Sequence, residues 1–405
     1  MTESLELFEK AGLVAVQYWQ DPKSNYRLWL LRKPPFFFPA KTLSLNKGAQ
    51  PLESQRFGSV PTRDEWTALW KLWDTITLGM IPEPMLHEKP IDLRHKCLFY
   101  LGHIPTFQDI HLTRLLDGKH TEPENFKDIF ERGIDPHVDD PNECHDHSAV
   151  PEKDEDWPAL KEILTFRDRV RRRVLDLYDD LDNGKRAYSR RTGRILWMTY
   201  EHEAFHAETL LYMLIQSRKT LPPPGFPRPS WEELGRQWDA THEENIVLQI
   251  EGGSVQLGHD DRESEDKLFE NDSSQWQDHE FGWDNENPRN VVRVKGFQVD
   301  SLPISNGDYW TYMQQTGSTE IPGSWYNSEG TPQVKTLYGP VPMTVAQHWP
   351  LMAGGEEFAA YAKWKGGRIP TEPELRMLWE SEVGPRPAGL SANVGVKRWH
   401  PIPWV

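Results

Sequence analysis

The chain has 405 residues, which is more than one hydrophobic core usually organises, so its length predicts two or three domains. Apolar residues make up 37% of it and 18 residues are tryptophan, a composition that excludes an intrinsically disordered chain. A formal net charge of −16 disfavours nucleic acid and anionic membranes as partners, because both repel an acidic protein. The sequence has no apolar run of the ~20 residues that cross a membrane, no secretory leader pattern and only two cysteines, so we expect a cytoplasmic protein.

Residues 1–45 predict one helix and two strands. A helical pattern at the start is followed by the strand-like runs VAVQYW (14–19) and YRLWLL (26–31), and then by the proline-rich run KPPFFFP (33–39). A hairpin with one helix is marginally stable by itself, so we expect this piece to pack on another part of the chain.

Residues 60–220 contain four segments with the periodicity of amphipathic helices. The first follows a capping box that begins at Thr62 and ends at Glu65. The second segment has Asp92 as its expected N-cap, and the other two cover about residues 160–181 and 195–216. Four such helices joined by long connections predict an all-α four-helix bundle.

Beyond the bundle the pattern changes. We interpret the proline-rich stretch 221–244 as a linker, because proline blocks helix formation. From residue 245 to the end, strand-like runs at 246–250, 254–258 and 291–300 alternate with turn residues. Helical patterns interrupt them at 306–315, at 356–365 and after a second capping box at Thr371. Residues 245–405 therefore predict an irregular α+β domain.

Three histidines of the bundle are candidates for a metal site. His202 and His206 are four residues apart, so they lie on one face of the last helix. His103 lies between two apolar residues of the second helix, which directs its imidazole toward the bundle interior. Three neutral imidazoles leave coordination positions open for chemistry. The spacing is equally compatible with ordinary hydrogen-bonded histidines, and it does not separate zinc from iron.

Two strings around these histidines resemble a known family. LGHIPTFQDIHLTRLL and YEHEAFHAETLLYML are similar to the DinB-like domain of the ergothioneine-pathway sulfoxide synthases, in which one histidine and an HxxxH pair bind iron(II). The resemblance implies that His103, His202 and His206 hold Fe(2+). Residues 250–258, 284–309 and 362–374 resemble the C-type-lectin-like domain of formylglycine-generating enzyme that follows in this family. Residues 1–45 resemble the end of the histidine-methylating domain of the fused, fungal-type members.

The resemblance implies an iron-dependent oxidoreductase that joins a thiol, cysteine, to hercynine with oxygen and yields a sulfoxide. Phe205 stands where bacterial relatives have a glutamine that contacts the substrate imidazole. Arg132 is a candidate for binding a substrate carboxylate, since guanidinium does so bidentately. Trp283, Trp325 and Tyr326 are candidates to enclose the trimethylammonium group of hercynine, with core packing as the alternative.

The chain also departs from the family pattern. No glycine-rich turn of a nucleotide-binding domain is present, so we do not expect S-adenosylmethionine chemistry. The chain stops at Val405, before the family's last strand and an active-site tyrosine, so we expect a protein truncated at both ends. Two alternatives follow: a zinc-dependent, DinB-like thiol transferase, and a truncated metal-binding protein without catalytic activity.

Overall fold

The structure, a computed structural model, describes residues 13–20, 26–33, 60–92, 94–131, 134–136, 144–146, 150–269, 279–327, 330–381 and 398–404, with a few isolated positions between them. The chain forms two compact units. Unit 1 comprises Met1–Ala49, Pro222–Leu257 and Asn290–Val405, and unit 2 comprises Gln50–Leu221 and Gly258–Arg289. The sequence predicted one continuous domain over 245–405. The structure differs, because the segment Gly258–Arg289 packs with the helices of unit 2.

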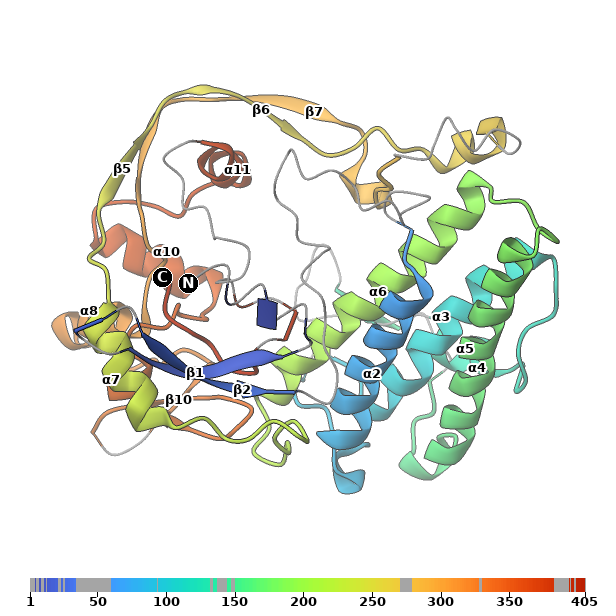
Figure 1. Cartoon of the computed structure of the whole chain (residues 1–405), viewed down its shortest axis with the longest axis horizontal. Coiled ribbons are helices and arrows are strands. Elements are labelled where there is room, and N and C mark those ends of the chain that lie inside the picture. The colour runs from blue at the N-terminus through green and yellow to red at the C-terminus, as the bar shows by residue number, and fades with distance from the viewer. Residues whose placement is uncertain are drawn as a thin grey trace. The chain divides into compact units, whose positions relative to one another are not determined.

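Unit 2 is built on four long helices that run side by side (Figure 1). They are α2 (Arg63–Gly79), α3 (Cys97–Leu116), α5 (Leu160–Asp182) and α6 (Arg190–Leu214). The predicted four-helix bundle is therefore present. Shorter elements of this unit are the helix α4 (Phe126–Phe130), the paired strands β3 (Ile134–Pro136) and β4 (Cys144–Asp146), and the 3-10 turns η2 (Glu83–Met85), η3 (Asp154–Asp156), η4 (Glu263–Phe269) and η6 (Asp284–Glu286).

The two predicted starts of bundle helices had different outcomes. The capping box before α2 is confirmed, because the Thr62 hydroxyl accepts from the Glu65 N–H and the Glu65 carboxylate accepts from the Thr62 N–H. The N-cap predicted at Asp92 is wrong, since α3 begins at Cys97. The preceding chain folds back, and its carbonyl oxygens at 88 and 86 accept from the N–H groups of residues 97 and 98. Main-chain acceptors thus satisfy the helix start without a side-chain cap.

Helix α3 lies at the centre of the bundle. It packs against α4, α5 and α6, and most of its side chains are buried. At Gly102 an added Cβ would lie 2.5 Å from the ring of Phe130, so the missing side chain lets α4 approach α3 closely. Because side chains around most of its circumference are buried, α3 is surrounded by other elements and forms the centre of unit 2.

Unit 1 contains two short antiparallel strand pairs that follow one another along the chain. Strand β5 (Val247–Ile250) pairs with β8 (Phe297–Asp300), and β6 (Gly253–Leu257) pairs with β7 (Asn290–Val294). The strand segments predicted there are confirmed. Gly252 lies between the two pairs, where a Cβ would come within 2.8 Å of the facing backbone.

The helices predicted in unit 1 are confirmed as α8 (Asn306–Thr316), α10 (Gly355–Trp364) and α11 (Glu372–Glu380), the last of which packs on β6 and β7. The N-terminal strands are confirmed as the hairpin of β1 (Val14–Gln20) and β2 (Arg27–Arg32). One small sheet of unit 1 is formed by three short strands, β9 (Trp325–Tyr326), β10 (Gln333–Val334) and β11 (Val341–Pro342). The short helix α9 (Met343–Ala346) follows β11.

The interpretation of 221–244 as a linker is wrong for its second half. Helix α7 (Trp231–Thr241) follows Ser230, carries Glu232 and Glu233 in its first turn and packs on α9. Acidic residues at a helix N-terminus are favourable because of the helix dipole. Trp231 is buried against Trp349, so the end of the proline-rich stretch is part of the core of unit 1.

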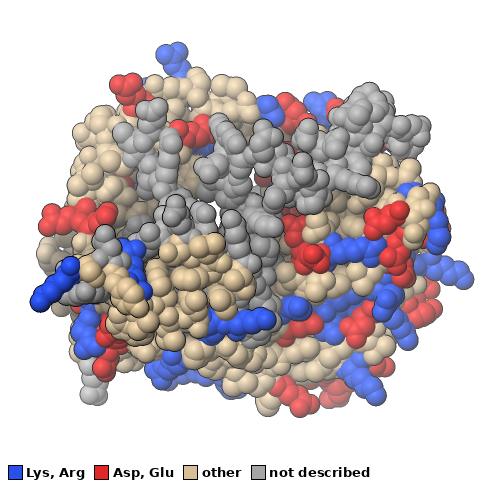
Figure 2. Space-filling model, in the orientation of Figure 1, with Lys and Arg blue, Asp and Glu red and all other residues tan. Residues whose placement is uncertain are grey.

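Charged side chains of both signs lie on the surface. On the face drawn in Figure 2, acidic and basic side chains lie interspersed over the described residues rather than gathered into one basic patch. None of the helices that the structure describes is long and apolar enough to cross a membrane.

Candidate metal centre

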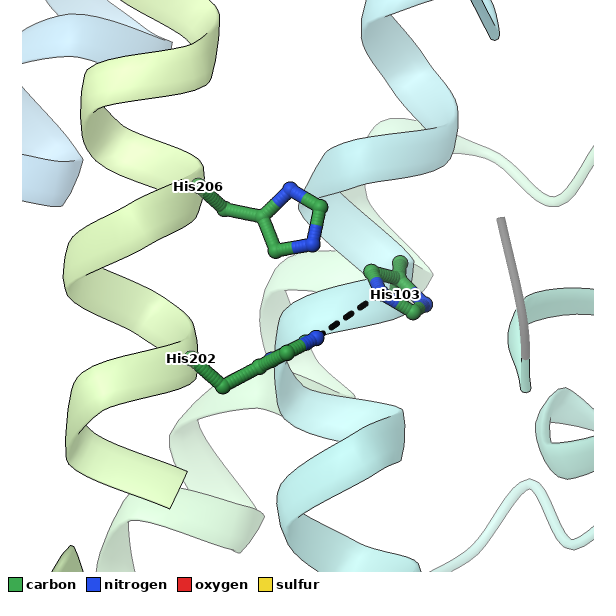
Figure 3. Close-up of side chains that lie close together, drawn as sticks. All are labelled: His103, His202 and His206. Carbon is green, nitrogen blue, oxygen red and sulfur yellow. Dashed lines mark hydrogen bonds between the residues drawn. The ribbon is translucent and has the colours of Figure 1, made fainter. Parts of the chain in front are cut away.

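The structure brings the three predicted histidines together in unit 2. His103 comes from α3, and His202 and His206 come from adjacent turns of α6 (Figure 3). The Nε2 atoms of His103 and His202 are 3.3 Å apart. One ring nitrogen from each of the three residues lies within 4.8 Å of the other two. These nitrogens are close enough to share one ion after small side-chain adjustments.

A hydrogen bond to the main chain fixes the orientation of His103. Its Nδ1 lies 2.8 Å from the carbonyl oxygen of Phe130, and since a carbonyl oxygen can only accept, Nδ1 is protonated and donates a hydrogen bond to it. The lone pair is then on Nε2, the atom that faces His202. This contact depends on Gly102, because only glycine lets Phe130 lie so close to α3. Such outer hydrogen bonds hold a histidine ligand in the tautomer that a metal requires.

Aromatic rings fix the planes of the imidazoles. Phe107 stacks on His202 with ring centroids 3.8 Å apart and an angle of 18°. Phe99 stacks on His103 at 5.2 Å, again at 18°. The sequence analysis missed both, although each is four residues from His103 on α3, a spacing that places them on its face.

All three imidazoles are neutral at pH 7. Burial lowers the pKa of His103 to about 4 and that of His206 to about 3. Burial, followed by the neighbouring histidines, holds the pKa of His202 well below its usual range. Among the described residues, the buried Nδ1 atoms of His202 and His206 have no hydrogen-bond partner. A site whose three imidazoles have a low affinity for protons can offer three nitrogen lone pairs to a divalent metal ion. Such an ion would keep further coordination positions open for substrates.

Glu203 lies beside His202 in the sequence but is not part of the cluster. It is almost fully buried, and burial raises the pKa of its carboxyl to about 7. Its Oε1 lies 3.8 Å from the guanidinium of Arg171 on α5. Within the part of the chain that the structure describes, the cluster contains histidine alone.

Two of the predicted substrate residues meet on α6, the helix that carries His202 and His206. Phe205 on α6 and Trp283 from the segment Gly258–Arg289 have ring centroids 6.3 Å apart. Trp283 also packs against Trp197, two turns earlier on α6, at 5.7 Å. Half of the Phe205 side chain is exposed, so this aromatic surface is accessible.

Two other predicted substrate residues belong to unit 1, and the third is not described. Trp325 is buried in the core of unit 1, where its Nε1 donates to the Asn306 side chain at 2.8 Å, so core packing accounts for it. Tyr326, also in unit 1, contacts Lys335 with its ring. Arg132 lies outside the described residues.

Two domain families match successive parts of the chain. Residues 58–210 match the DinB superfamily, and residues 233–380 match the sulfatase-modifying factor enzyme 1-like domain. Over 93% of its length the chain is 38% identical to ergothioneine biosynthesis protein 1 of Neurospora crassa and 31% identical to that of Schizosaccharomyces pombe. It covers 44% and 47% of these two relatives, less than half of each.

A bacterial protein shows a more distant similarity. The hercynine oxygenase of Mycobacterium tuberculosis is 28% identical over 148 residues, which are 30% of this chain and 34% of that protein. The matches to both domain families and to the fungal proteins together cover the bundle with its histidine cluster and most of unit 1. The chain is thus similar along most of its length to ergothioneine biosynthesis protein 1 and over 30% of it to hercynine oxygenase, and it contains regions that match the DinB superfamily and the sulfatase-modifying factor enzyme 1-like domain.

Proposed function

We propose that this chain is an iron(II)- and oxygen-dependent sulfoxide synthase that joins cysteine to hercynine, with His103, His202 and His206 as the iron ligands. The observation that carries the proposal is the cluster of three neutral imidazoles, one buried and two partly buried, whose ring nitrogens lie within 4.8 Å of one another. The names of the relatives, which refer to ergothioneine and hercynine, support the substrate class.

The proposed reaction replaces the hydrogen at C2 of the hercynine imidazole by sulfur. One oxygen atom of O₂ ends on the sulfur, and the other leaves as water with the C2 hydrogen and the thiol hydrogen. Bound iron(II) supplies the redox chemistry with oxygen and a positive charge that favours the thiolate form of the substrate. Cysteine, hercynine and oxygen are thus the proposed small-molecule partners.

The chain's own residues position the reactants. Phe130 and the stacked rings hold the imidazole ligands, so that little reorganisation is needed when substrates bind. Phe205, which precedes His206 on α6, and Trp283, which packs against it, offer aromatic faces that suit an imidazole and a trimethylammonium group. Arg132 remains our candidate for a substrate carboxylate.

We further propose a reducing, cytoplasmic setting, in keeping with the buried, free thiol of Cys97.

Oxygen uptake tests this function against its two alternatives. The chain is loaded with iron(II) under anaerobic conditions and then given hercynine, cysteine and oxygen. We expect oxygen consumption that requires both substrates, together with a sulfoxide product identified by mass spectrometry. Turnover with zinc and without oxygen would instead identify a thiol transferase. Tight metal binding without any turnover would identify a non-catalytic protein.

A further inference from the structure

A buried ion network joins the start of α6 to the segment Gly258–Arg289. Arg194 forms two hydrogen bonds with Asp261, at 2.5 and 2.7 Å, and two with Asp266, at 2.7 and 2.8 Å. Arg190 adds a third donor to Asp261 at 2.8 Å. All four residues are buried, with at most 7% of their surface exposed. Paired bidentate contacts of this kind fix orientation as well as distance.

Asp261 also holds the backbone on both sides of Trp283. Its carboxylate accepts from the N–H of Gly282 at 2.8 Å. Its own N–H donates to the side chain of Asn287 at 2.7 Å, and the amide of Asn287 donates to the carbonyl oxygen of Trp283 at 2.8 Å. The position of Trp283 is therefore linked to α6 through one aspartate.

Trp283 in turn completes an aromatic surface on α6, the helix that also carries His202 and His206. Its ring lies between those of Trp197 and Phe205, which are two turns apart on α6. Glu201 lies one turn from each of these residues, and the structure describes no hydrogen bond or ion pair for its carboxylate. Aromatic faces around a carboxylate without a partner suit an organic cation better than a neutral or anionic group.

We propose that Asp261 is a positioning residue for substrate binding: it holds Trp283 against Phe205, and the resulting surface receives the cationic end of the substrate. This inference rests on the proposed function, because it assigns the trimethylammonium group of hercynine to that surface. Asp261 itself is buried and bonded to α6, so it acts through Trp283 and does not touch the substrate.

Steady-state kinetics with Asp261→Asn tests the proposal. We expect the KM for hercynine to rise about tenfold, while the KM for cysteine and the iron content stay unchanged, because one aromatic contact to a cation is affected. Asn287→Ala is a milder second variant, which loosens Trp283 without removing a buried charge, and it should shift the same KM in the same direction. Asp109→Asn is the matched control. Asp109 is a buried carboxylate of unit 2 bonded to Arg173 and Thr121, and its loss should leave the KM for hercynine unchanged.

A double-mutant cycle separates positioning from general stability. In the Trp283→Ala background, Asp261→Asn should change the KM for hercynine less than twofold, since the residue through which it acts is gone. An effect of equal size in both backgrounds, or an equal rise of both substrate KM values, overturns the proposal.

Hydrogen exchange tests the positioning independently of catalysis. Asp261→Asn should remove the protection of the amides around Gly282 while the amides of α3 and α5 keep theirs. Unchanged protection around Gly282 overturns the positioning role. Wild-type protein without turnover refutes the proposed function instead, and the exchange result then still decides whether Asp261 positions Trp283.

Discussion

Replacement of Gly102 by alanine should damage the metal centre without touching a histidine. The new methyl group would lie 2.5–2.6 Å from three ring atoms of Phe130, whose side chain is fully buried. Overpacking of this kind costs about 1–3 kcal/mol. If α4 shifts away, the Nδ1 of His103 loses its acceptor, which costs about another 1–3 kcal/mol for a buried donor.

Part of this loss is offset, because alanine favours a helix over glycine by about 1 kcal/mol. We therefore expect Gly102→Ala to lower the free energy of unfolding by about 3 kcal/mol and to weaken metal binding about 10- to 100-fold through the lost support of His103. Urea denaturation of the apoprotein and competition with a chelator measure the two effects.

Gly118→Ala is a suitable control, since its nearest neighbour would be the flexible end of Arg173 at 3.9 Å. Phe130→Leu in the Gly102→Ala background should recover part of the stability, because a smaller side chain relieves the clash. If Gly102→Ala has wild-type stability and wild-type metal affinity, the close packing of α4 on α3 does not support the centre.

Three further outcomes are expected. His206→Ala should abolish iron retention, measured by metal analysis, while the far-UV circular dichroism stays nearly unchanged; a wild-type iron content would rule out this ligand set. Thr62→Ala removes the capping box of α2 and should lower the free energy of unfolding by about 1 kcal/mol in urea, whereas Thr67→Ala on the same helix should have a smaller effect. Burial lowers the pKa of His400 to about 4, so the unfolded chain takes up a proton at this residue first as the pH falls below about 6.5. The stability of the wild type should consequently decrease between pH 6.5 and 4 by about 2 kcal/mol more than that of His400→Gln, and equal pH profiles would contradict the burial of this side chain.

Local patterns predicted the elements that have strong local causes. The four bundle helices follow from periodic apolar residues, and the capping box at Thr62 follows from two side chains three positions apart. The start of α3 could not be predicted, because its N–H groups are satisfied by carbonyl oxygens of residues 86 and 88 rather than by a side chain. Helix α7 was missed because the prolines that precede it dominate the composition of 221–244.

The same distinction applies to the candidate site. The spacing of His202 and His206 is a property of one helix, and it predicted their common face. The support of His103 by Phe130 and the contact of Trp283 with Phe205 join residues far apart in the sequence, so no periodicity could show them. The apolar neighbours of His103 made it the third candidate and the resemblance to a family assigned all three as ligands, but neither showed which side chains hold the ligands in place.

The path of the chain between the two units has a consequence for how they can be separated. Strand β6 ends at Leu257 and β7 begins at Asn290, and these two residues are paired. The segment Gly258–Arg289 between them belongs to unit 2, so the chain leaves unit 1 and re-enters it at neighbouring residues. A fragment cut at residue 221 would keep all three histidines but would leave Arg190 and Arg194 facing water without their aspartates. A chimera that takes the bundle from one relative and unit 1 from another should therefore take residues 258–289 from the same relative as the bundle.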